Sequence, residues 1–107
     1  MNDTPETTLT DGSPVTSDHR DINPATGQQK GYVVLSDAAR AKGFVRPLRN
    51  SYIHLPCGVV TKMAISIAET YARDPKFYGG TFCISCKQHF PLDQFIWDDG
   101  TNTMVGS

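Results

Sequence analysis

The sequence is poor in the residues that most folded domains use to build a core. Only 38% of its 107 residues are hydrophobic, and it holds a single tryptophan, which is less apolar content than an average globular domain has. No apolar run approaches the roughly 20 residues that cross a bilayer. The polar, acidic start also lacks the apolar stretch of a secretory leader. We therefore expect neither a membrane span nor secretion, and we expect a cytoplasmic protein.

Cysteine is scarce as well. The chain has three cysteines, and an odd number cannot pair off into a disulfide framework. At this length one domain is expected, and a folded unit of about 75 residues is near the size at which a core alone is marginal. In a reducing compartment, a metal ion is the expected staple for so small a core.

Apolar residues are rarest at the start of the chain. Residues 1–30 are dominated by Thr, Ser, Asp, Pro and Gly, and up to residue 29 they carry five acids against one base. Such a segment cannot bury enough apolar surface to offset its ordering entropy. We expect residues 1–30 to form a flexible, disordered acidic arm, or an arm that becomes ordered only on a partner surface. Residues 31–107 are then the folded domain.

The local patterns beyond residue 30 predict an α+β fold with short antiparallel strands. The β-branched run at 31–36 and the segment 51–55 favour strands, and 36–43 favours a short helix capped by Ser36. The main helix is expected over 61–74, with Thr61 as its cap and Asp74-Pro75 as its end. A strand is expected at 81–83, and the turn residues 98–100 favour a hairpin at the end of the chain.

Two pairs of metal-binding residue types flank the main helix. His54 and Cys57 form one pair, and Cys83 and Cys86 form the other, each with two residues between its members. A two-residue gap lets one tight turn present both side chains to the same ion, and tetrahedral zinc takes two ligands from each of two turns. Gly58 follows the first pair, where a left-handed backbone is useful. The pattern predicts one structural Zn²⁺ held by three cysteines and one histidine.

Other readings of these residues remain open. His89 lies three residues after Cys86 and is an alternative fourth ligand. However, one turn seldom gives three ligands to one ion, which favours His54. Free cysteines are often small buried hydrophobes. A redox Cys-x-x-Cys normally opens a helix, whereas here the helix comes first.

The pairs and their surroundings resemble a zinc ribbon or zinc knuckle. The stretch "HLPCG" is similar to the family's Cys-Pro-x-Cys-Gly knuckle, with histidine in place of the first cysteine, and "TFCISCKQHFPLDQFIW" is similar to the metal-binding end of small zinc-ribbon proteins of bacteriophages. The long gap between the pairs, which holds a helix, is a departure from a simple ribbon. The resemblance implies a metal-binding fold and a phage-type protein of the host cytosol or virion. It implies no activity.

The sequence lacks a catalytic set. A zinc deaminase needs His-x-Glu, but Pro56 stands where the glutamate would be. A metal-dependent nuclease could use His89 with Asp93 or Asp98, although both acids suit solvated turns. No nucleophile motif or phosphate-binding glycine loop is present. We expect a protein that is not an enzyme and has no small-molecule substrate.

The middle of the chain is basic, because residues 38–68 contain five bases and no acid. Arginine grips phosphates and aromatic rings stack on bases, so nucleic-acid binding is one hypothesis. We rank it second to docking on a larger protein assembly, such as a virion, a host transcription machinery or a host defence complex, because the net charge of −1 is unlike that of most nucleic-acid binders. The residues that would contact nucleic acid or a partner are Arg40, Lys42, Arg46, Arg49 and Lys62, beside Phe44 and Tyr52.

Overall fold

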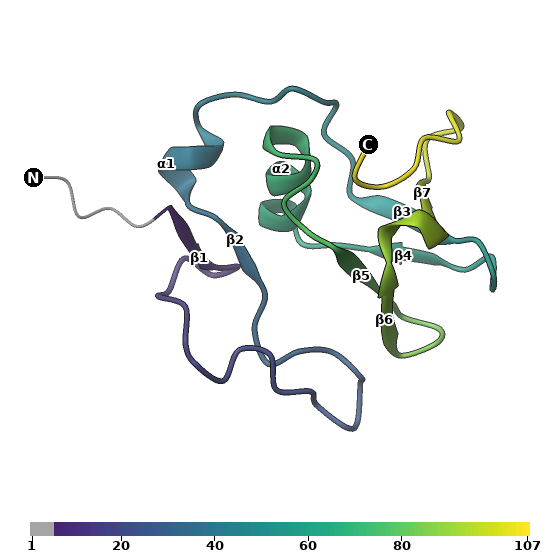
Figure 1. Ribbon diagram of the computed structural model, residues 1–107, viewed down its shortest axis with the longest axis horizontal. Coiled ribbons are helices and arrows are strands. Elements are labelled where there is room, and N and C mark those ends of the chain that lie inside the picture. Colours follow the sequence, from purple (N-terminus) through teal and green to yellow (C-terminus); the bar gives the residue numbers. More distant parts are fainter. Residues whose placement is uncertain (1–5) are drawn as a thin grey trace, which may run out of the picture.

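The computed structural model describes residues 6–107, and within them the chain has the mixed α and β character that the sequence predicts. This range contains two α-helices and seven short strands, and the strands form three small antiparallel sheets (Figure 1). Neither helix in this range has the length and apolar character needed to cross a membrane. In chain order the elements are β1 Thr7–Leu9, β2 Val33–Leu35, α1 Asp37–Arg40, β3 Ser51–His54, β4 Val60–Lys62, α2 Ile65–Arg73, β5 Gly80–Cys83, β6 Gln88–Pro91 and β7 Phe95–Trp97.

The sheet that contains His54 has the strand order β4-β3-β7. In its central strand β3, Tyr52 lies opposite Thr61 of β4 and Trp97 of β7. Tyr52 and His54 alternate with partly exposed neighbours, so one face of β3 is buried. The expected hairpin at the chain end forms only in part, through a bridge between Ile96 and Met104. The β5-β6 hairpin is a separate sheet that carries the cysteine pair at its turn.

Helix α2 lies at the centre of the molecule, between the N-terminal strands and the β4-β3-β7 sheet (Figure 1). It ends at Asp74, before Pro75, as the sequence predicts. Its start differs from the prediction, because it begins after Ala64. Thr61, expected as its cap, is instead a buried residue of β4 whose hydroxyl accepts a hydrogen bond from the Ile84 backbone. Residues 60–62 therefore form a strand because they pair with β3, although their sequence pattern favours a helix.

The short helix α1 follows the expected pattern. The Ser36 side chain accepts a hydrogen bond from the Ala39 backbone N–H, which caps the helix. Asp37 lies in the first turn and Arg40 in the last, where each charge complements the helix dipole. The helix spans one turn, although the sequence predicted two.

The main core lies where α2, β3, β5 and β7 meet. Its fully buried members are Tyr52, Tyr71, Cys83, Phe95, Trp97 and Val105. The aromatic residues between 71 and 97 favour a core by sequence, and Tyr71, Phe82, Phe95 and Trp97 are buried. Tyr78 and Phe90 pack against the cluster with partial exposure, and Phe77 is also partly exposed. Tyr52, expected at a binding face, is a core residue instead, because its strand alternation points it inward. Its hydroxyl donates to the Phe82 carbonyl.

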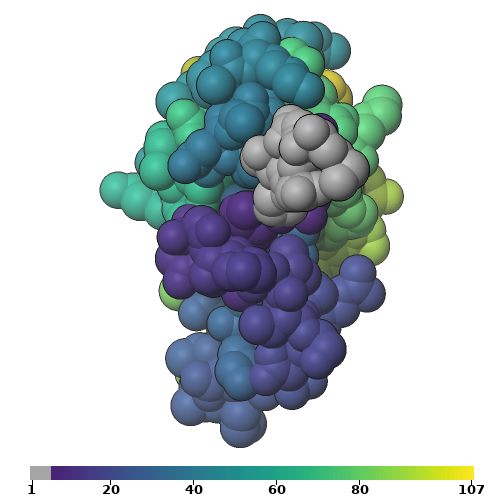
Figure 2. Space-filling model, turned by 90° about the vertical axis from the view of Figure 1, so that its left-hand side faces the viewer, coloured from purple at the N-terminus to yellow at the C-terminus, as the bar shows by residue number. Residues whose placement is uncertain are grey.

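The segment expected to be a disordered arm takes a defined course over residues 6–30, and residues 1–5 of it lie outside the described residues. Strand β1 pairs antiparallel with β2, and Ser36 N donates to the Glu6 carbonyl. Figure 2 shows the N-terminal segment covering the lower part of the face that it presents. Composition did not predict this course because backbone pairing to an edge strand needs little apolar side-chain burial.

Candidate metal centre

The first turn of the site begins where β3 ends. His54 is the last residue of the strand, and its carbonyl accepts hydrogen bonds from the backbone N–H groups of Cys57, at 3.2 Å, and of Gly58, at 2.7 Å. These bonds fold the chain back, so that the side chains of His54 and Cys57 face the same point. Gly58 has φ +72°, a left-handed conformation that glycine adopts without steric cost.

The second turn repeats this geometry at the tip of the β5-β6 hairpin. Cys83 ends β5, its carbonyl accepts from Lys87 N at 2.8 Å, and its sulfur accepts from Cys86 N at 3.5 Å. Lys87 takes the position that Gly58 has in the first turn and has φ +56°. The two turns therefore match in backbone shape, although only one carries the glycine.

Four donor atoms from the two turns converge on one point. The Nδ1 atom of His54 lies 3.4 Å from Cys57 Sγ and 3.7 Å from Cys86 Sγ, and Cys57 Sγ lies 3.6 Å from Cys83 Sγ. All four donor atoms lie within 4.8 Å of one another. Both turns lie on the right-hand side of the molecule in Figure 1. The group could hold one metal ion.

The imidazole of His54 is fixed by its surroundings. It is buried, and it packs against the rings of Phe90 and Phe95, with centroid distances of 4.4 and 4.8 Å. Its Nε2 atom lies 2.8 Å from Oε1 of Gln94. A carboxamide oxygen accepts, so Nε2 carries the proton and Nδ1 presents its lone pair to the three sulfurs.

The sulfur of Cys83 contacts both of the other cysteines: the Cys57 sulfur and the backbone N–H of Cys86. Burial acts to raise its pKa, but hydrogen bonds from the Cys86 backbone N–H and from the Cys57 thiol more than offset this, and they lower the pKa of Cys83 to about 7. The thiolate is the form that binds metal. Hydrogen bonding within the cluster therefore favours the thiolate form of Cys83.

The other two histidines lie outside this group. The Nε2 atom of His89 lies 2.9 Å from the Tyr32 hydroxyl, and Nδ1 of His19 lies 2.7 Å from the Thr16 carbonyl. Over residues 6–107, the set His54, Cys57, Cys83 and Cys86 is the one cluster of three or more metal-ligating side chains. No such cluster in this range includes His89, Asp93 or Asp98.

Gln94 is a functional candidate that the sequence did not reveal. It lies in a short 3-10 turn, Leu92–Gln94, which brings its side chain back over His54. A polar residue beyond the second cysteine pair carries no spacing signal, and only the three-dimensional path of the chain shows this contact.

No protein family, no curated protein and no solved structure matches this chain. The donor chemistry and the geometry of the four side chains are thus the grounds for assigning a metal to the site.

Two of the five predicted binding bases are engaged within the molecule. Arg40 forms ion pairs with Asp37 and Glu69, and Arg49 lies 3.6 Å from Asp99. The Arg49 guanidinium also lies over the Trp97 ring, 4.6 Å from its centroid. The side chains of Arg40 and Arg49 are only 13% and 12% exposed. Sequence reasoning missed the pairings with Glu69 and Asp99 because these two acids come from distant segments.

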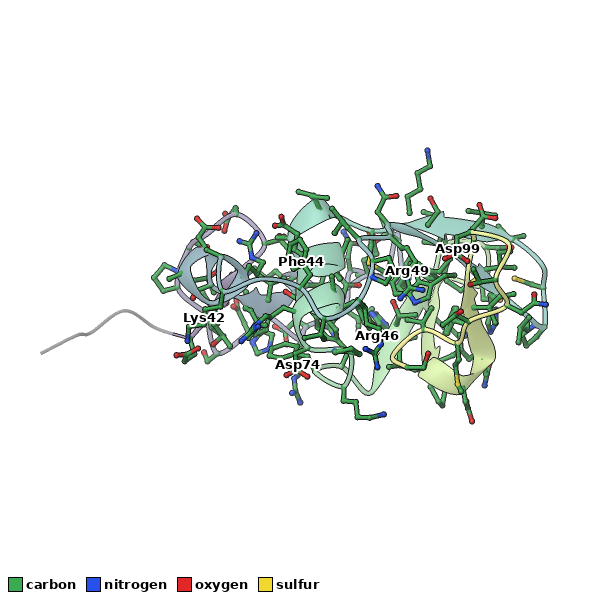
Figure 3. The ribbon with its side chains drawn as sticks, turned by 90° about the horizontal axis from the view of Figure 1, so that it is seen from above. Lys42, Phe44, Arg46, Arg49, Asp74 and Asp99 are labelled. Atoms are coloured by element: carbon green, nitrogen blue, oxygen red, sulfur yellow. The ribbon has the colours of Figure 1, made fainter. Side chains whose placement is uncertain are left out.

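The remaining three predicted binding bases have exposed side chains. Lys42, Arg46 and Lys62 are exposed, and Phe44 is partly exposed beside them in sequence. Figure 3 shows Lys42 toward the end of the molecule that carries β1, while Arg46 lies nearer to β7. Arg46 donates to the carbonyls of Val45 and Ser107.

Proposed function

We propose that the chain is a non-enzymatic protein-interaction module whose fold is stapled by one Zn²⁺. The observation that carries the metal assignment is the meeting of three thiols and one imidazole from two tight turns, all within 4.8 Å. A set of sulfur and nitrogen donors favours Zn²⁺ over the oxygen-loving Mg²⁺ and Ca²⁺.

The donor separations fit zinc in size. With Zn–S bonds of about 2.3 Å, the edge of a tetrahedron between two sulfurs is about 3.8 Å. The distance between Cys57 Sγ and Cys83 Sγ is 3.6 Å. The distance from His54 Nδ1 to Cys86 Sγ is 3.7 Å. An ion would therefore enter with small adjustments of the side chains.

Four protein ligands suit a structural ion better than a catalytic one. Catalytic zinc keeps an open position for water or substrate, whereas structural sites are closed by four side chains. Gln94 adds the hydrogen bond to the non-ligating nitrogen that orients most metal-bound histidines. The ion would join β3 to the β5-β6 hairpin, so its binding free energy would be part of the folding free energy.

The turns themselves offer a surface for docking. Leu55 and Ile84, which lie between the ligands of each pair, are 53% and 54% exposed, and Val59 and Val60 beside the first turn are also exposed. Clustered apolar side chains on a rigid support are typical of protein contacts. By contrast, Arg40 and Arg49 are paired with carboxylates and are less free to bind phosphates. This favours a protein partner, and nucleic acid is the second candidate.

Site-specific photocrosslinking tests the docking function. A photoreactive phenylalanine at Ile84 should give one protein adduct of defined mass in cells that make the chain, and the same residue at the exposed Thr101 should not. Adducts with nucleic acid alone, or adducts equal at both positions, would contradict a protein-docking role. Zinc content of the same samples, measured by elemental analysis, separates failure of docking from failure of the metal assignment.

A further inference from the structure

A cavity of about 730 Å³ lies between the N-terminal segment, the start of α2 and the β5-β6 hairpin. This volume falls within the roughly 300–1,000 Å³ of sites that bind small molecules. None of the four candidate metal ligands lines it. The cavity is therefore a separate feature from the metal centre.

The floor of the cavity is aromatic. Tyr52, Tyr71 and Phe82 lie beneath it and are each 5% exposed or less. The rings that a ligand can reach are those of the partly exposed lining residues Tyr32, Phe77 and Tyr78. Aromatic rings pack well against other rings, in stacked or edge-to-face arrangements. A flat apolar group is thus the body of a ligand that this floor would accept.

Three hydroxyl groups interrupt the apolar floor. Thr81 Oγ1 donates to the Tyr52 hydroxyl at 3.3 Å. Burial raises the pKa of Tyr52 to about 12, and it raises the pKa of Tyr71 still more, with contact to Thr81 offsetting only part of the change. These hydroxyls are therefore neutral hydrogen-bonding groups and bring no negative charge to the cavity.

The charge that lines the cavity is of one sign. Arg20 and Lys62 are exposed lining residues, and His19 and His89 also line it, whereas no aspartate or glutamate is among the lining residues. Within residues 6–107, neither Arg20 nor Lys62 takes part in an ion pair, unlike Lys30, Arg40 and Arg49. Two unpaired cations over a low-dielectric floor attract anions.

We propose that this cavity binds a small aromatic anion. The ring would lie against Tyr32, Phe77 and Tyr78. Its carboxylate or phosphate would point to Arg20 and Lys62. Those two bases come from separate segments, the N-terminal loop and β4. Both bases line the same cavity, and this juxtaposition is what the inference uses.

Four probes distinguish the contribution of the aromatic ring to binding from that of the negative charge. They are phenyl phosphate, phenylacetate, benzylamine and inorganic phosphate. Each is titrated into the full chain with zinc present, and backbone amide NMR shifts are recorded. Fragments of this size bind with Kd in the millimolar range even in good sites. We expect saturating shifts around the cavity with phenyl phosphate or phenylacetate, and the tighter of the two identifies the anionic group. Binding of benzylamine with equal affinity would overturn the proposal.

Two kinds of variant locate the site. Gly79 lines the cavity, and a Cβ added there meets no heavy atom within 4 Å and no left-handed backbone, so Gly79→Leu should fill the space without unfolding the chain. It should weaken binding at least tenfold. Arg20→Ala and Lys62→Ala should each weaken it about two- to fivefold, and Lys42→Ala, an exposed base elsewhere, should not. Unchanged binding in Gly79→Leu, with its amide spectrum intact, would place the probes outside the cavity and refute the inference.

Discussion

The side chains of His54 and Gln94 are joined by a hydrogen bond of 2.8 Å between Nε2 and Oε1. Because the amide oxygen accepts, the other ring nitrogen is left with its lone pair facing the three cysteines. Gln94 would therefore act on an ion bound by the cluster through His54, although it contributes no ligand.

Replacing Gln94 with leucine should weaken zinc binding by about 10- to 100-fold while leaving the stoichiometry at one ion per chain. The cause is loss of the group that fixes the tautomer and tilt of His54. Competition with a chromophoric chelator measures the affinity. Gln88→Leu, at an exposed position of β6, is the matched control. Equal affinity in Gln94→Leu and the native chain would mean that the packing of Phe90 and Phe95 alone orients the ring.

Lys87→Gly should stabilise the zinc-bound protein by about 1 kcal/mol. Lys87 has φ +56°, and side chains with a Cβ are strained in that region. Gly58→Ala should have the opposite sign and a similar size, since Gly58 has φ +72°. Urea unfolding at saturating zinc gives both free energies. A destabilised Lys87→Gly variant would show that the lysine side chain has a stabilising contact that outweighs the strain.

Arg49→Ala should lower the free energy of unfolding by about 1–2 kcal/mol, because it removes both the contact over Trp97 and the pairing with Asp99. Arg46→Ala, at an exposed position of the same segment, should change it by less than about 0.5 kcal/mol. Thermal or urea unfolding of the two variants distinguishes them. Equal effects would mean that Arg49 is not a structural residue.

Stability should fall as the pH is lowered, in part through His89. Burial lowers the pKa of His89 in the folded protein, while the unfolded chain has the ordinary value of about 6.5. The unfolded state then binds the proton first, so this part of the stability is present above about pH 6.5 and is lost as the pH falls through the folded pKa. His89→Gln should show a smaller loss between pH 7.5 and 5.5 in urea unfolding. An identical loss would assign the whole effect to other groups, the cysteines foremost.

The sequence predicted the pairs of the metal centre because two-residue spacing is a local property of tight turns. It also predicted the α+β class, the α1 cap and the end of α2, which depend on neighbouring residues. It failed where contacts between distant segments decide the outcome. Thr61 joined a strand, Tyr52 entered the core and Arg40 paired with Glu69. Thr7–Leu9 paired with β2.

Phage origin, the partner and the identity of the ion stay predictions. They depend on molecules other than this chain, and the exposed apolar residues Leu55 and Ile84 indicate only where such a partner would bind.

Zinc content per chain, measured by elemental analysis on the native protein and three variants, tests the central claim most directly. We predict one zinc in the native chain and in His89→Ala, none in His54→Ala, and one again in His54→Cys, because a fourth thiolate can replace the imidazole in a closed tetrahedral site. Addition of a chelator should then unfold the native domain. Absence of zinc from native protein that was kept reduced and never exposed to chelator, or its retention in His54→Ala with loss in His89→Ala, would contradict the two-turn site.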